Sequence, residues 1–184
     1  MQRWPSMLLS GLLLTGISSC SVLPHAPGLS SPAWQTHTLQ QADYQRQDQV
    51  EVQWKNHGFS FLLYQQQHGS QLELLALSLT GQQLFKLNFN GHRVKVEQRI
   101  AQMKLLPFEF VVRDILFATY PNFIQLQQSD QVQSKAHNQG QEIWINQSKV
   151  LTIQQVDGGI ELDNGQVPYQ MSFHPIANTL QNNE

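Results

Sequence analysis

Two adjacent charged residues, Arg113 and Asp114, lie in a strongly apolar segment and are the one candidate for acid–base chemistry. Charged residues in an apolar segment more often stabilise the fold than take part in catalysis, so we favour a structural role for Arg113 and Asp114. The chain contains no G-x-S-x-G nucleophile turn, no H-E-x-x-H metal motif and no glycine-rich phosphate loop. Its seven His are scattered without ligand spacing. We therefore expect no catalytic residues, no metal and no cofactor.

The single Cys, Cys20, ends a short leader. Arg3 precedes an apolar run too short to cross roughly 30 Å of bilayer hydrocarbon, which takes about 20 apolar residues. A cationic start, a short apolar stretch and small residues at its end are typical of a secretory signal. Residues 17–20, ISSC, resemble the bacterial lipobox, in which the thiol is acylated and becomes the N-terminus. We predict a signal peptide over residues 1–19 and lipidation of Cys20.

Lipidation would make the membrane a binding partner, because each acyl-chain methylene placed in a bilayer contributes about 0.8 kcal/mol to the free energy of membrane binding. The alternative, an unmodified thiol, is disfavoured because secreted proteins seldom keep one without a use. Ser21, not Asp, follows the Cys, a choice that resembles outer-membrane sorting. Residues 20–34 are rich in Pro and Ser and hold no charge, which is typical of a flexible tether. We expect a lipid-anchored protein on the periplasmic face of the outer membrane.

The composition is that of a globular protein, with 40% hydrophobic residues and a formal net charge of −2. Collagen-like, coiled-coil and fully disordered chains are thereby excluded. We expect no nucleic-acid partner, because no excess of positive charge is present to neutralise phosphates. We predict one folded domain over residues 35–175, a polar tail over residues 176–184, and a monomer.

Alternation of apolar and polar residues predicts five strands between residues 49 and 99, and four more over residues 142–146, 149–156, 159–163 and 167–173. The polar stretch 129–140 is interpreted as a loop. Turn residues then set the strand registers. A loop at residues 80–81 places Leu74 opposite Leu87, and Asn-Gly loops at residues 90–91 and 164–165 place Leu87 opposite Val94 and Leu162 opposite Val167.

Residues 107–120, PFEFVVRDILFATY, predict a helix that starts near Pro107 and is apolar around most of its circumference. Such a helix must be buried on nearly all sides. The predicted fold class is α+β: a curved antiparallel sheet of eight to eleven strands, an incomplete β-barrel, packed on this apolar helix.

One face of the predicted sheet is apolar and wide. A helix about 20 Å long and 10 Å across leaves part of such a concavity vacant, and unfilled apolar space costs roughly 24 cal/mol per Å³. We therefore expect an apolar lipid-like ligand there, the alternative being closure by side chains as in small barrels. The predicted lining residues are Phe61, Leu63, Leu74, Phe85, Leu87, Phe89, Val94, Val96 and Ile115.

The other face carries two features that suggest partners. Lys86 and Lys95 face each other in the predicted register, and an anionic lipid headgroup held by Lys86, Arg93 and Lys95 would relieve their repulsion. The alternative is a solvated face that discourages edge pairing. An apolar patch on this face would suit a protein partner, in a docking or assembly role. It comprises Leu62, Tyr64, Leu75, Leu77 and Leu84.

The leader, the tether, residues 76–85 (ALSLTGQQLF), the 107–120 helix and residues 169–173 (YQMSF) together resemble an uncharacterised family of small proteobacterial lipoproteins with a domain of unknown function. Genes of that family often lie beside synthesis genes for aryl polyene pigments. In shape the family is similar to the LolA/LolB lipoprotein carriers, incomplete barrels whose apolar face holds acyl chains under helices.

The resemblance covers most of residues 35–175. It implies an outer-membrane lipoprotein that binds a lipid or acyl chain, in lipid or lipoprotein transfer linked to export of aryl polyene-type lipids. LolB has a loop of sequence Asn-Pro-Leu-Gly that corresponds to residues 78–81 here. The Gly is kept, and Thr80 stands in place of the projecting leucine.

Overall fold

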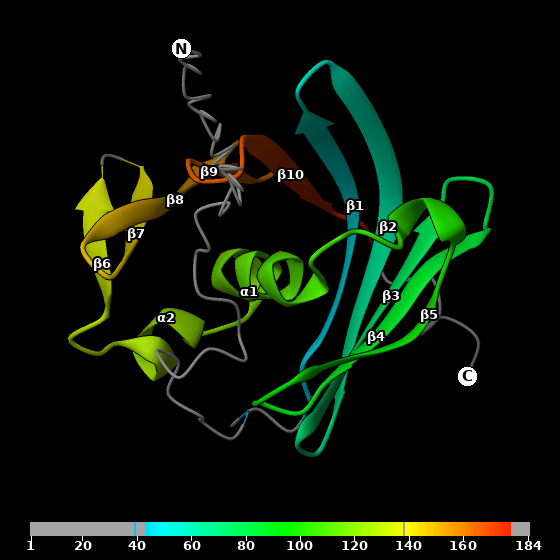
Figure 1. Cartoon of the computed structure of the whole chain (residues 1–184), viewed down its shortest axis with the longest axis horizontal. Coiled ribbons are helices and arrows are strands. Elements are labelled where there is room, and N and C mark those ends of the chain that lie inside the picture. The colour runs from blue at the N-terminus through cyan, green and yellow to red at the C-terminus, as the bar shows by residue number, and fades with distance from the viewer. Residues whose placement is uncertain (1–38, 40–42, 138, 178–184) are drawn as a thin grey trace, which may run out of the picture.

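The computed structural model describes residues 39, 43–137 and 139–177. The predicted signal peptide, Cys20, the tether and most of the tail lie outside the described residues. Ten antiparallel strands form one sheet in the order β5-β4-β3-β2-β1-β10-β9-β8-β7-β6 (Figure 1). The strands are β1 (Gln45–Trp54), β2 (His57–His68), β3 (Gln71–Ser78), β4 (Gln83–Phe89), β5 (Val94–Arg99), β6 (Val132–His137), β7 (Gly140–Ile145), β8 (Ser148–Val156), β9 (Gly159–Asn164) and β10 (Tyr169–Pro175). The predicted curved, open antiparallel sheet is confirmed.

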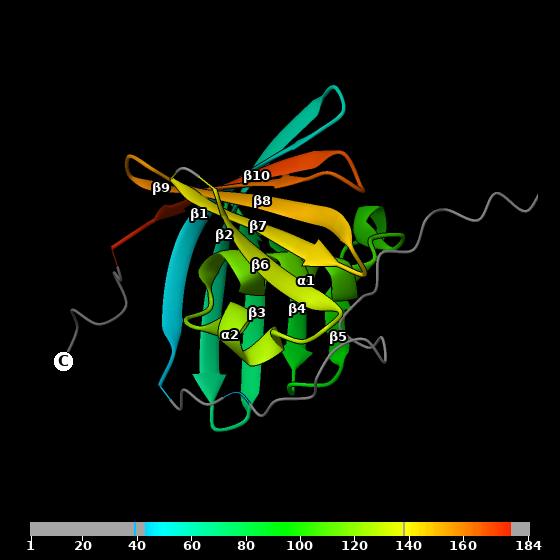
Figure 2. The same cartoon turned by 90° about the vertical axis from the view of Figure 1, so that its left-hand side faces the viewer.

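The sheet consists of two meanders, β1–β5 and β6–β10, which are joined where β1 pairs with β10. The chain crosses from the β5 edge to the β6 edge through η1 (Ala101–Met103), α1 (Phe108–Thr119) and α2 (Phe123–Gln127). Figures 1 and 2 show α1 inside the curve of the sheet. Val112, Ile115 and Leu116 of α1 are fully buried in the same apolar cluster as the inner residues of the strands.

The register between β3 and β4 is the one that the turn residues predict. Leu74 pairs with Leu87 and Ala76 with Phe85, and all four side chains are buried. Because side chains alternate across a strand, this pairing directs one set of apolar residues to the inside of the sheet.

The two Asn-Gly registers are wrong, the first by two residues and the second by four. Leu87 pairs with Val96, not Val94, and Leu162 pairs with Met171, not Val167. The reason is side-chain capping: Asn90 Oδ1 accepts hydrogen bonds from the backbone N–H groups two and three residues on, at 3.0 and 2.9 Å, and Asn164 does the same. Such Asx turns close a wider loop than a two-residue hairpin. Both shifts are even numbers of residues, so Leu87, Val96, Leu162 and Met171 still belong to the inner face.

The polar stretch 129–140 was interpreted as a loop, and this is wrong. It contains β6, an edge strand in which Val132 alone is buried, paired along its length with β7. An edge strand with little to bury lacks the apolar alternation by which strands are recognised, and polar residues there protect the edge. The short helix α2 and the turn η1 also lie in segments where no helix was expected.

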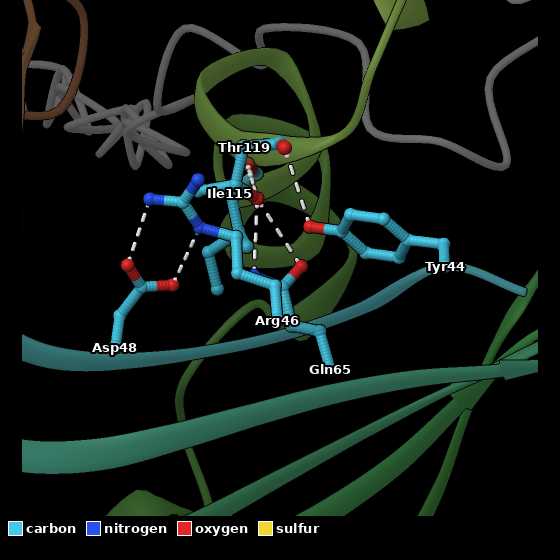
Figure 3. A network of polar contacts seen from close by, with 6 residues as sticks. All are labelled: Tyr44, Arg46, Asp48, Gln65, Ile115 and Thr119. Carbon is cyan, nitrogen blue, oxygen red and sulfur yellow. Dashed lines mark hydrogen bonds and ion pairs between the residues drawn. The ribbon is translucent and has the colours of Figure 1, made fainter. Parts of the chain in front are cut away.

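Toward the C-terminal end of α1, the inner face of the sheet becomes polar (Figure 3). Gln65 Nε2 donates to Thr119 Oγ1 at 3.1 Å, and that hydroxyl donates to the Ile115 carbonyl oxygen at 2.8 Å. The Tyr44 hydroxyl donates to the Thr119 carbonyl oxygen at 3.2 Å. These bonds satisfy polar groups at a buried helix end, which would otherwise be costly.

We expect the Tyr44→Phe variant to lose less stability at high pH than the unsubstituted protein. Burial raises the pKa of Tyr44 from 10.0 to about 12. The native state therefore holds this proton more tightly than the unfolded chain. Its contribution to stability is complete below about pH 10 and is lost as the pH rises toward 12, at most about 1.4 kcal/mol per pH unit.

Urea unfolding at several pH values between 9 and 12 measures this difference. Other buried tyrosines titrate in both proteins, so only the difference between the two curves reports on Tyr44. Parallel curves for the variant and the unsubstituted protein would contradict the prediction.

Candidate functional site

An apolar pocket of about 100 Å³ lies between the N-terminal half of α1 and the end of the sheet that carries the β1–β2 hairpin. Its surface is almost wholly apolar. The lining residues come from β1, β2, β4, β10 and the crossover: Val52, Trp54, Phe59, Phe61, Phe85, Met103, Leu106, Pro107, Phe110, Val111, Val167, Tyr169 and Met171. Strands and helix that are distant in sequence thus meet around a small volume that their own side chains leave open.

The pocket runs from an exposed rim to a buried base. Trp54, Phe59 and Val167 at the rim are exposed, whereas Phe61 and Phe85 deeper inside are buried. The rings of Phe59 and Phe61 lie 6.1 Å apart in a stacked arrangement, and Phe61 meets Phe85 edge-on at 6.0 Å. Aromatic pairs in these geometries hold each other in place, so this wall is well ordered for an apolar ligand.

A polar network lies behind one wall of the pocket. The Tyr169 hydroxyl donates to Asp114 Oδ2, and Asn164 Nδ2 donates to the same oxygen at 2.7 Å. Arg113 Nε lies 2.5 Å from the other carboxylate oxygen, and its guanidinium is 5.2 Å from the Phe110 ring centre. Burial, and then the nearby Asp114 carboxylate, raises the pKa of Tyr169. Its ring therefore faces the pocket while its protonated hydroxyl is held away from it.

The network also accounts for Arg113 and Asp114, the one candidate acid–base pair. Both side chains are fully buried, and the carboxylate binds Arg113, Asn164 and Tyr169 together. This arrangement joins α1 to the turn before β10. A structural role, the reading that the sequence favours, is consistent with these contacts.

Only two of the nine predicted lining residues, Phe61 and Phe85, line the pocket. Val94 and Val96 on β5 are half-buried against the core, and the remaining predicted residues are fully packed within it: Leu63, Leu74, Leu87, Phe89 and Ile115. The helix fills the middle of the concavity, so space remains at one end.

Most of the residues that line the pocket are not among those predicted from the sequence. Trp54 and Phe59 continue the apolar alternation of their strands to the tip of the β1–β2 hairpin, where burial alone does not call for large side chains. That position was a usable signal. Met103, Leu106 and Val167 lie in turns without periodicity, and only the folded chain brings them together.

The predicted opposition of Lys86 and Lys95 is wrong, because Lys86 pairs with Gln98 and Lys95 with Asn88. Lys86 Nζ lies 2.8 Å from a Glu73 carboxylate oxygen, whose hydrogen bond raises the pKa of this lysine. Lys95 Nζ lies 3.7 Å from Glu97. The repulsion that motivated an anionic headgroup at Lys86, Arg93 and Lys95 is therefore absent.

On the convex face, Leu62 pairs with Leu77 and Tyr64 with Leu75, and all four side chains are half-buried. Leu84, which the sequence placed in the same patch, packs against the core instead. A register shift between Ala76 and Leu77 separates it from the others. The patch on β2 and β3 is therefore smaller than expected.

In the described part of the chain, no three His, Cys, Asp or Glu side chains gather in an arrangement that could hold a metal ion. No helix among residues 43–137 and 139–177 has the length and apolar character needed to span a bilayer.

The model of a family described as "Protein of unknown function (DUF3261)" matches residues 45–177, from the first residue of β1 past the end of β10. The matched region therefore includes every strand of the sheet and every pocket residue. No curated protein matches the chain.

Proposed function

Because this chain belongs to a family of proteins of unknown function (DUF3261), we propose a function from the site itself: the domain binds the hydrocarbon of a lipid or acyl chain. The pocket carries this proposal, since its surface is almost wholly apolar and it opens at an exposed apolar rim. Water is poorly accommodated by such a surface, and each methylene that replaces it contributes about 0.8 kcal/mol.

The volume of the pocket limits what it holds. Apolar cavities of about 150 Å³ accept a molecule such as benzene, so about 100 Å³ accepts the end of a hydrocarbon chain and not a whole lipid. The rest of the ligand would lie along the rim formed by Trp54, Phe59 and Val167.

The cellular setting that we propose is a non-enzymatic lipoprotein, anchored to the outer membrane through Cys20. The lipobox-like leader and the open, curved sheet around α1 support it, and the likeness to LolB is part of the resemblance noted in the sequence. Within that setting the protein would carry or transfer lipids or lipoproteins, in a role linked to export of aryl polyene-type lipids. This last link comes from the resemblance noted in the sequence.

The lipid-binding proposal is tested with the chain from Ser21 onward, purified without detergent. We expect solvent extraction and mass spectrometry to recover an acyl lipid, and a fluorescent fatty acid to bind saturably. If no lipid is recovered and the fluorescent fatty acid shows no saturable binding, the proposal fails.

A second candidate function is docking of a protein partner on the convex patch of Leu62, Tyr64, Leu75 and Leu77. Contiguous half-exposed apolar side chains on two central strands favour it. We expect Leu75→Ser with Leu77→Ser to leave fatty-acid binding unchanged, because neither residue lines the pocket. If docking is the function, the same variant loses a cross-linked partner that the unsubstituted protein captures; retention of that partner would exclude the patch.

A further inference from the structure

The exposed large apolar residues of the described chain gather at one end of the molecule. Trp54 and Phe59 flank the tip of the β1–β2 hairpin, with 43% and 41% of their surface exposed. Val167, 37% exposed, precedes Tyr169, which pairs with Trp54. Leu105, 93% exposed, follows the η1 turn. Leu79, the fifth, follows the last residue of β3.

Three of these residues, Trp54, Phe59 and Val167, line the apolar pocket directly. Met103, two residues before Leu105, and Leu106, directly after it, line the pocket as well. In Figure 1 the β1–β2 hairpin, the short coil of η1 after β5 and the β3–β4 turn all lie in the upper part of the molecule. Single exposed apolar residues are ordinary on protein surfaces, but a concentration of them around a pocket marks an interaction site.

The same end carries two exposed lysines. Lys55, at the hairpin tip, and Lys104, beside Leu105, are exposed, and neither forms an ion pair with a described carboxylate. Lys55 Nζ lies 5.8 Å from the Trp54 ring centre. Glu109, in the first turn of α1, is the acidic residue closest in sequence to Lys104 and is only partly exposed. Lys and Trp side chains together are typical of the interface between bilayer hydrocarbon and headgroups.

We propose that this end, the mouth face of Trp54, Phe59, Leu79, Leu105 and Val167 with Lys55 and Lys104, docks on a lipid bilayer that bears anionic headgroups. The proposal rests on the proposed lipid binding and adds the route to it. With the mouth face on the bilayer, a hydrocarbon chain enters the pocket without crossing water. The lysines meet the headgroups while the apolar side chains reach the acyl region.

The test places a fluorescent label at either end of the molecule. In the full chain carrying Cys20→Ala, a nitrobenzoxadiazole label is attached at Leu105→Cys or, as a matched control, at Gln71→Cys. Gln71 is exposed at the β2–β3 turn, at the opposite end of β3 from Leu79. Vesicles of phosphatidylethanolamine and phosphatidylglycerol carry a nitroxide on the acyl chain. The difference in quenching between the two label positions reports which end of the molecule lies in the hydrocarbon, whichever part of the chain binds the vesicle.

We expect quenching at position 105 to be several-fold stronger than at position 71. Lys55→Glu with Lys104→Glu, or high salt, should lower it to the control level, because salt screens exposed charges. Equal quenching at both positions, or none at position 105, would overturn the docking proposal. If quenching at position 105 is as strong in phosphatidylcholine vesicles as in the vesicles with phosphatidylglycerol, the choice of an anionic bilayer would be overturned.

Fatty-acid binding in solution separates this proposal from the one on which it rests. The charge-reversed variant should bind a soluble fluorescent fatty acid as the unsubstituted protein does, since neither lysine lines the pocket. Fatty-acid binding could be absent in the unsubstituted protein and in its variants while position 105 is still quenched selectively. That result would contradict the proposal that the pocket binds lipid and would support the docking proposal.

Discussion

The Asp114→Ala variant is expected to lose about 3–5 kcal/mol of unfolding free energy, the usual cost of removing one partner of a buried ion pair. Asp114 is fully buried and accepts hydrogen bonds from Arg113, Asn164 and Tyr169. Without the carboxylate, the buried guanidinium loses its counter-charge, and α1 loses its bonds to the β9–β10 turn. Domains of this size are stable by about 5–15 kcal/mol, so a large part of that stability would be lost.

Urea unfolding at neutral pH measures this loss. A matched control breaks an ion pair on the surface: Lys149 Nζ lies 3.2 Å from Glu142, and both side chains reach solvent. Lys149→Ala should cost less than about 1 kcal/mol. If Asp114→Ala costs no more than Lys149→Ala, the buried network does not stabilise the join between helix and sheet.

The second large effect is expected on binding. Val111→Trp should lower the affinity for a fluorescent fatty acid by tenfold to a hundredfold, because the indole occupies the volume that the ligand would fill. Val111 lines the pocket and is only half-buried. Displacing two or three methylenes at about 0.8 kcal/mol each gives a loss within this range.

The pocket is open space, so the larger side chain should cost less than the roughly 1–3 kcal/mol of ordinary overpacking. Val94→Trp is the matched control, since Val94 is also half-buried against the core but does not line the pocket. Its fatty-acid affinity should be unchanged. A folded Val111→Trp variant that binds as tightly as the unsubstituted protein would show that the ligand lies elsewhere.

Wherever the sequence alternates strictly, it determined which face of the sheet each side chain takes. Leu74 and Leu87 were placed on the inner face, and they are buried there. Even the two misjudged hairpins preserved this result, because errors of two and four residues leave the side-chain period unchanged. The loop size itself depended on a hydrogen bond from each Asn side chain to the backbone beyond it. Asn-Gly is compatible with both loops, so sequence alone did not decide between them.

The apolar character of residues 107–120 likewise predicted a buried helix, and α1 is one. Only the tertiary structure decided which part of the concave inner face of the sheet the helix leaves unfilled. The sequence predicted that Leu63 and Leu87 line the vacancy, but both are buried in the same core cluster as α1, and the pocket lies between the N-terminal half of α1 and the end of the sheet with the β1–β2 hairpin.

The same holds for the side chains around that pocket and behind it. Asp114 meets partners 50 and 55 residues away, and the mouth face combines Trp54 and Phe59 of two strands with turn residues that carry no periodic signal. Periodicity records how one segment divides its side chains between core and solvent. It contains no record of which distant turns meet, because that follows from the curvature of the sheet and the position of the helix. The sequence therefore determined the sheet and its apolar interior, and only the packing of the two meanders on α1 decided where that interior opens.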